Sequence, residues 1–68
     1  MGKKLRDFNK GLMIGQEIKN TVSRDDMKMV RCIMGYDPHG IPGVIRFLGM
    51  SIGINREIRL GMWIELKK

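Results

Sequence analysis

The clearest pattern of apolar and polar positions lies near the end of the chain. From Glu57 to Lys67, apolar side chains occupy every second position and alternate with charged, glycine and aromatic residues. A period of two is typical of a β-strand, because successive side chains of a strand point to opposite faces. The pattern predicts a strand whose one face carries Ile58, Leu60, Met62, Ile64 and Leu66.

The segment before this strand contains the residues that bend a chain. Residues 35–43 hold three glycines and two prolines, which predicts a loop or turn. Residues 44–48 are apolar except for Arg46 and predict a second strand leaving that loop. Gly49 and Gly53 interrupt the apolar pattern where a sheet bends. Short strands bent at glycines predict a mainly β fold, a small antiparallel barrel.

The N-terminal third permits more than one interpretation. Residues 1–11 form a basic, polar arm that is either frayed or a short packed turn. Residues 12–18 suit a helix by spacing, but the flanking glycines favour a short strand, which we expect. Ser23 is either a helix N-cap or part of a loop, and residues 27–34 are either a strand or a short helix. We therefore expect the arm, then one domain over residues 12–68, with a short N-terminal helix as the alternative.

Length and charge narrow the function classes. A chain of 68 residues forms one small domain, which buries only about 60% of the surface exposed by its unfolded chain. Thirteen basic residues against seven acidic ones give a formal net charge of +6. Such a surface attracts nucleic acid, an anionic membrane surface or acidic peptides, unless it is only a solvated surface.

Features of the remaining sequence indicate where the chain resides. Cys32 is the single cysteine, so it forms no internal disulfide, and its apolar neighbours predict that it packs as a small hydrophobe. The basic start lacks the apolar stretch of a secretory signal, and the longest apolar run is too short to span a bilayer. A reducing, soluble compartment follows, and we expect the cytoplasm.

No arrangement of residues predicts catalysis. The acidic residues are scattered without a Ser/His/Asp or Cys/His set, and no glycine-rich loop is followed by Lys and Ser or Thr. His39 is the only histidine and has no further ligand at metal-binding spacing. Asp25 and Asp26 favour a cap or loop over a metal site. We expect a non-enzyme without cofactor, metal or small-molecule substrate.

Aromatic and basic residues are the candidates for binding. Trp63 lies on the opposite face of the predicted strand from the apolar row, between Arg59 and Lys67 on the same face. An exposed tryptophan there would stack on a base or an aromatic side chain, whereas a buried one would pack in the core. Tyr36 and His39 lie on the predicted loop, where they are either ligand contacts or ordinary turn residues.

Two segments resemble a known family. Residues 43–49, Gly-Val-Ile-Arg-Phe-Leu-Gly, followed by residues 61–66, Gly-Met-Trp-Ile-Glu-Leu, resemble the first half of a CAP-Gly domain. The spacer that includes residues 52–57 is more similar to the divergent CAP-Gly modules of the cylindromatosis deubiquitinase. The resemblance implies an SH3-like barrel that binds extended, often acidic peptides, with Phe47 and Trp63 as important positions. The family's Gly-Lys-Asn-Asp-Gly signature has no counterpart after Leu66.

A smaller resemblance points elsewhere. Residues 12–18 are similar to an early segment of the carbon storage regulator family, and residues 52–55 to a later one. That family implies a dimeric β-protein that binds RNA hairpins.

The sequence therefore predicts a non-catalytic module that binds an acidic or extended protein segment. The alternative is a basic nucleic-acid-binding protein, RNA or DNA, that uses phosphate contacts and aromatic stacking. A structural subunit of a larger assembly is a third class. The methionine-rich core and exposed strand edges favour a homodimer. The expected ligand-binding residues are Tyr36, His39, Arg46, Phe47, Arg59 and Trp63.

Overall fold

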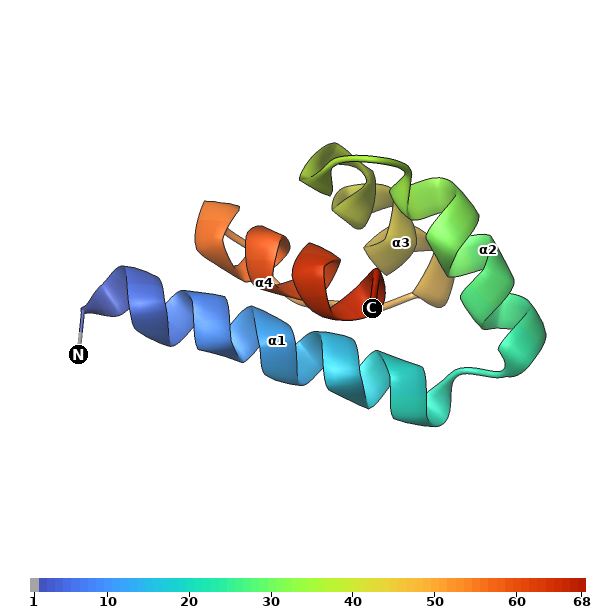
Figure 1. Ribbon diagram of the computed structural model, residues 1–68, viewed down its shortest axis with the longest axis horizontal. Coiled ribbons are helices and arrows are strands. Elements are labelled where there is room, and N and C mark those ends of the chain that lie inside the picture. The colour runs from blue at the N-terminus through green and yellow to red at the C-terminus, as the bar shows by residue number, and fades with distance from the viewer. Residues whose placement is uncertain (1) are drawn as a thin grey trace.

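The computed structural model describes residues 2–68, and over these residues every regular element is a helix (Figure 1). The order is α1 (Lys3–Thr21), α2 (Arg24–Met34), a 3₁₀ turn η1 (Pro38–Gly40), α3 (Ile41–Leu48) and α4 (Arg56–Leu66). The predicted SH3-like β-barrel is therefore wrong, and the CAP-Gly-like fold is wrong with it. The described part of the chain is a small helical bundle.

The strand predicted over residues 57–67 is α4. Its alternating row contains Ile58, Met62 and Leu66, which are spaced by four and are all buried. Positions four apart share one face of a helix, so a row with a period of two also contains a helical face. The side chain of Asn55 starts the helix, because its Oδ1 accepts the Ile58 N–H at 2.9 Å. Good helix formers and this cap decide the local structure.

The ambiguous N-terminal third is helical. The strand expected over residues 12–18 is wrong, because α1 runs unbroken through residues 3–21 and includes most of the predicted arm. The N-cap interpretation of Ser23 is confirmed, since its Oγ accepts the Asp26 N–H at 3.1 Å. Asp25 and Asp26 lie in the first turn of α2, where negative charge stabilises a helix.

The predicted loop over residues 35–43 is only partly a loop. Gly35 ends α2 with a φ of 65°, which favours glycine, and the chain turns through residues 35–37. Helical structure then resumes at Pro38, inside the segment predicted to be irregular. Pro42 lies in the first turn of α3, where its missing N–H costs no hydrogen bond. After Gly49, residues 50–55 carry the chain back to the start of α4 without regular structure.

Helices α1 and α4 run parallel and side by side (Figure 1). Three glycines allow their backbones to meet: a Cβ on Gly61 would overlap the Phe8 carbonyl oxygen, and one on Gly11 would overlap the Ile58 carbonyl oxygen. A Cβ on Gly15 would lie 2.8 Å from the Cβ of Glu65. Helices joined by short loops pack antiparallel, so the parallel arrangement depends on the long connection through α2 and α3.

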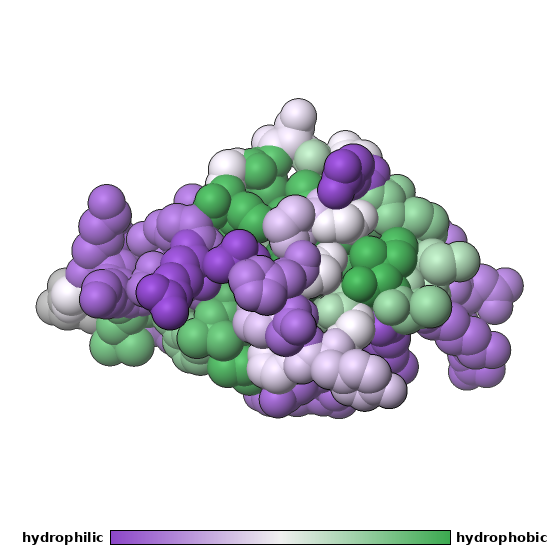
Figure 2. Space-filling view, turned by 90° about the horizontal axis from the view of Figure 1, so that it is seen from above, coloured by the Kyte–Doolittle hydropathy of each residue, from purple (hydrophilic) through white to green (hydrophobic). Residues whose placement is uncertain are grey.

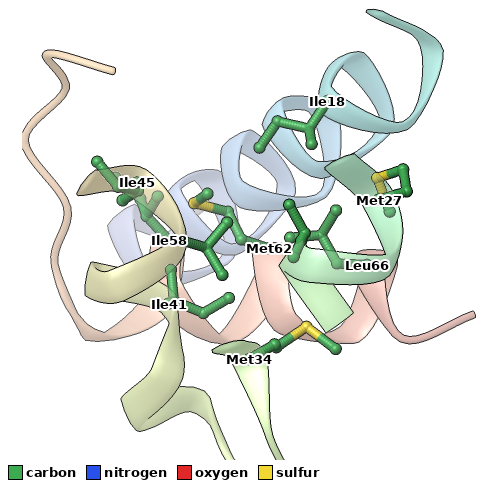
Figure 3. Close-up of a cluster of buried hydrophobic side chains, with 10 residues drawn as sticks. Ile18, Met27, Met34, Ile41, Ile45, Ile58, Met62 and Leu66 are labelled. Atoms are coloured by element: carbon green, nitrogen blue, oxygen red, sulfur yellow. The ribbon is translucent and has the colours of Figure 1, made fainter. Parts of the chain in front are cut away.

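The core lies between the pair and the α2–α3 layer (Figure 3). Ile18 is the one buried apolar side chain from α1, because Asp7, Gly11 and Gly15 occupy the other buried positions of that helix. The prediction for Cys32 is wrong, since it lies exposed on α2. Within residues 2–68, no helix has the length and apolar character to cross a bilayer. The core contains Ile18, Met27, Val30, Met34, Ile41, Val44, Ile45, Ile58, Met62 and Leu66.

Candidate functional site

The six residues expected to bind a partner lie on different parts of the bundle. Tyr36 lies in the turn after α2 and is fully exposed, and His39 lies in η1. Arg46 and Phe47 are exposed on α3. Arg59 and Trp63 are half-buried on α4.

His39 and Arg59 line one pocket of about 280 Å³ between η1 and the first turns of α4. Its other lining residues are Pro38, Arg56 and Leu60. The sequence analysis missed Arg56 as a site residue, although a helical interpretation of this segment would have found it. Residues three apart are neighbours on a helix, which puts both arginines beside one space.

Trp63 lies one turn further along α4. The Nζ of Lys67 lies 3.9 Å from the centroid of its ring, a cation–π contact. The prediction that Arg59, Trp63 and Lys67 share a face does not depend on the wrong secondary structure. Their spacing of four is even, as a strand requires, and is also one helical turn.

Two buried donors on this face lack acceptors. The Nε of Arg59 and the Nε1 of Trp63 are covered, and neither donates a hydrogen bond to the described residues. Leaving such a group unpaired costs about 1–3 kcal/mol. Both groups are donors only, and both atoms are covered, so a ligand could reach them only after neighbouring side chains move.

The start of α1 adds further positive charge close to the start of α4. Because the two helices are parallel, both present the positive end of the helix dipole at the same end of the bundle (Figure 1). In Figure 2, hydrophilic side chains gather at this end of the molecule. The first turn of α1 contains no acidic residue. We call this end, together with Arg56 and Arg59, the basic end; its α1 members are Lys3, Lys4, Arg6 and Lys10.

This placement works against helix stability. A cation near a helix N-terminus is disfavoured by roughly as much as an anion is favoured, about 0.3–1 kcal/mol. Several such cations at two aligned helix termini each make an unfavourable contribution to the free energy of folding of this small domain. The arrangement stabilises the fold less than the reversed charges would, and it creates a strong positive field.

Two of the seven acidic residues are nearly buried and make contacts within the bundle. The carboxylate of Asp7 is nearly buried and accepts a 2.6 Å hydrogen bond from the Asn55 amide, with Arg6 at 3.9 Å. Glu65 is also nearly buried and pairs with Lys19 at 2.9 Å and with Lys68 at 3.4 Å.

The contacts of Glu65 alter its titration. The hydrogen bond from Lys19 lowers the pKa of Glu65 below its ordinary value, burial opposes this shift, and Lys68 reinforces it. Among residues 2–68, no carboxylate lies within ion-pair distance of His39, Arg56 or Arg59. Within the described residues, the pocket arginines therefore have no ion-pair partner, although Asp37 and Glu57 adjoin the lining residues Pro38 and Arg56 in sequence.

A second, apolar groove of about 390 Å³ lies along the C-terminal half of α1 and was not predicted. It runs between the C-terminal half of α1 and the segment after α3. Helical spacing on α1 would have identified its inner wall, but no sequence signal placed the later segment against it. Its lining residues are Ile14, Glu17, Ile18, Thr21, Val22, Leu48, Met50 and Ile52.

Over the described residues, no group of three or more His, Cys, Asp or Glu side chains is arranged to hold a metal ion. Comparisons of the chain with protein-family models, with curated proteins and with solved structures found no match. The basic end and its pocket therefore have to be interpreted from their own chemistry.

Proposed function

We propose that this protein is a non-catalytic nucleic-acid-binding module that contacts the phosphate backbone through the basic end. One observation carries the proposal: cations are gathered at two aligned helix N-termini, where they oppose the helix dipoles and outnumber the nearby carboxylates of Asp7 and Glu57. A phosphate backbone supplies the missing negative charges in a closely spaced row.

The geometry favours a strand of nucleic acid over a compact anion. From Lys3 to Lys10, α1 rises about 10 Å, and from Arg56 to Lys67, α4 rises about 16 Å. Positive charge thus follows two helices over several nucleotides' length. Trp63 adds an aromatic side chain to this track, as in surfaces that bind single strands by charge and stacking.

An acidic protein segment is the second candidate. The pocket combines two arginines with the apolar rings and methyl groups of Pro38 and Leu60, which suits a carboxylate side chain beside an apolar one. The extended-peptide groove implied by an SH3-like barrel is not available to this fold. The second candidate therefore depends on charge and this pocket alone.

Binding of a labelled single-stranded RNA, measured by fluorescence anisotropy between about 50 and about 300 mM salt, tests the proposal. The affinity should fall with salt with a logarithmic slope of about 0.7 for each phosphate contacted. Removing three α1 charges, by Lys3→Gln, Lys4→Gln and Lys10→Gln together, should weaken binding and reduce the slope.

The matched control removes three exposed charges from α2, by Arg24→Gln, Lys28→Gln and Arg31→Gln. Both triple variants lower the net charge equally, so only a located interface distinguishes them. Equal losses would contradict the basic end as the interface. Absence of RNA binding together with saturable binding of an aspartate-rich peptide would replace the proposal with the second candidate.

We also keep the homodimer as a proposal. It no longer depends on strand edges, but Leu5 and Met13 leave apolar side chains half-exposed or more on α1. Sedimentation across micromolar concentrations tests it, and a strictly monomeric particle would contradict it.

A further inference from the structure

The pocket beside η1 differs from the rest of the basic end because it has walls. Arg56 and Arg59 form one side from α4, and Pro38 and His39 form the other from η1. An internal phosphodiester is followed by nucleotides on both sides, so it needs a groove that is open at both ends. A pocket with walls better accommodates the end of a nucleic-acid strand.

The position of His39 is fixed by its own turn. The Oδ1 of Asp37 accepts the backbone N–H of His39 at 2.8 Å, which caps the 3₁₀ turn and engages the nearest carboxylate of that turn. Pro38 further restricts the backbone. The backbone of His39 is therefore held beside the pocket, and Asp37 is outside the set of lining residues.

The two arginines present complementary donors. Arg56 is the first residue of α4 and exposed, whereas Arg59 is half-buried and has its Nε covered without an acceptor. A guanidinium binds a phosphate through two parallel N–H donors. Because the Nε of Arg59 is covered, a ligand in the pocket meets the other guanidinium donors, and a phosphate group matches the charge of the two arginines.

We infer that this pocket receives the terminal phosphomonoester of the bound nucleic acid. A terminal phosphate carries a charge of about −1.5 to −2 at neutral pH and three free oxygens, whereas an internal diester carries one charge. Two arginines match the larger charge, and the histidine adds a polar side chain to the lining. Pro38 and Leu60 supply apolar contact for the adjoining sugar. The inference rests on the proposed function, and it names which part of the nucleic acid the site selects.

Three versions of one short single-stranded RNA test the inference: one with a 5′-phosphate, one with a 3′-phosphate and one with hydroxyls at both ends. We expect the native protein to bind one phosphorylated version about ten-fold more tightly than the hydroxyl version, roughly the contribution of one charge-assisted contact. Inorganic phosphate at millimolar concentration should reduce this preference and leave the binding of the hydroxyl version unchanged.

Variants identify the residues responsible for the preference for phosphorylated RNA. Arg56→Gln and Arg59→Lys should each reduce it to about two-fold or less, the second because lysine keeps the charge but has no paired donors. Arg24→Gln is the matched control, since Arg24 is also exposed and also the first helical residue after an N-cap. It should retain the ten-fold preference. Circular dichroism identifies any variant that fails to fold, and Arg56→Gln changes only an exposed side chain.

The outcomes separate the two proposals. Equal binding of all three RNAs would overturn the terminal-phosphate inference and leave the proposed function standing. Absence of binding to any of them would overturn both. A phosphoserine peptide that binds more tightly than the phosphorylated RNA would keep the pocket's phosphate chemistry but overturn nucleic acid as its source.

Discussion

Asn55 connects the starts of the two parallel helices through its one side chain. Its Oδ1 accepts the Ile58 N–H at 2.9 Å and caps α4, while its Nδ2 donates to Asp7 of α1 at 2.6 Å. The cap therefore also satisfies a nearly buried carboxylate, 48 positions away in the chain. This one amide therefore makes both a local helix cap and a long-range hydrogen bond.

Replacement of Asn55 should cost more than the loss of an ordinary cap. Asn55→Ala removes the cap and leaves Asp7 without its best partner, so we expect a loss of about 2–4 kcal/mol in the free energy of unfolding. Ser23→Ala removes a cap without a long-range contact and should cost about 1 kcal/mol. Urea denaturation of both variants measures the difference. Equal costs would show that the bond to Asp7 contributes nothing.

Alanine at Gly61 should destabilise the protein, against the usual trend for helices. Alanine normally favours a helix over glycine by about 1 kcal/mol. Here its Cβ would overlap the backbone of α1, so the helices must separate, at a cost of about 1–3 kcal/mol. Gly53→Ala, where the Cβ meets nothing within 4 Å, is the control and should be neutral or slightly stabilising. A stabilised Gly61→Ala variant would contradict the close contact.

Glu65 should make folding sensitive to acid. Because Lys19 lowers its pKa in the folded state, its pair stabilises the fold above the ordinary pKa of glutamate. This stabilisation is lost as the pH falls through the lowered pKa. Between about pH 7 and about pH 2, Glu65→Gln should therefore lose less stability than the native chain. Glu17→Gln, on the exposed side of α1, should follow the native curve, and identical curves for all three would refute the assignment.

The sequence predicts the boundaries of this fold better than its elements. The N-cap at Ser23 and the turn at Gly35 follow from local chemistry, and both are present. The strand predicted over residues 57–67 fails because Ile58, Met62 and Leu66 satisfy two periods at once. Periodicity alone cannot separate them when the residues between are also apolar.

The glycines explain the other error. Gly11 and Gly15 favoured a short strand over residues 12–18, and Gly61 fell inside the strand predicted over residues 57–67, whereas all three are points of close contact between helices α1 and α4. That role depends on a partner distant in sequence, so no local pattern reveals it. The grouping of Arg59 with Trp63 was predictable, but the contribution of Arg56 to the pocket required the helix to be known.

The parallel pair also affects how the chain is made. Lys19 and Glu65, which bond across it, are separated by 46 positions. At a synthesis rate of about 5–20 residues per second, α1 waits roughly 2–9 s before its partner helix is made. During this interval its two interior glycines lower its tendency to form a helix. The residues that permit the close contact in the finished protein thus reduce the helical order of α1 while the chain is being synthesised.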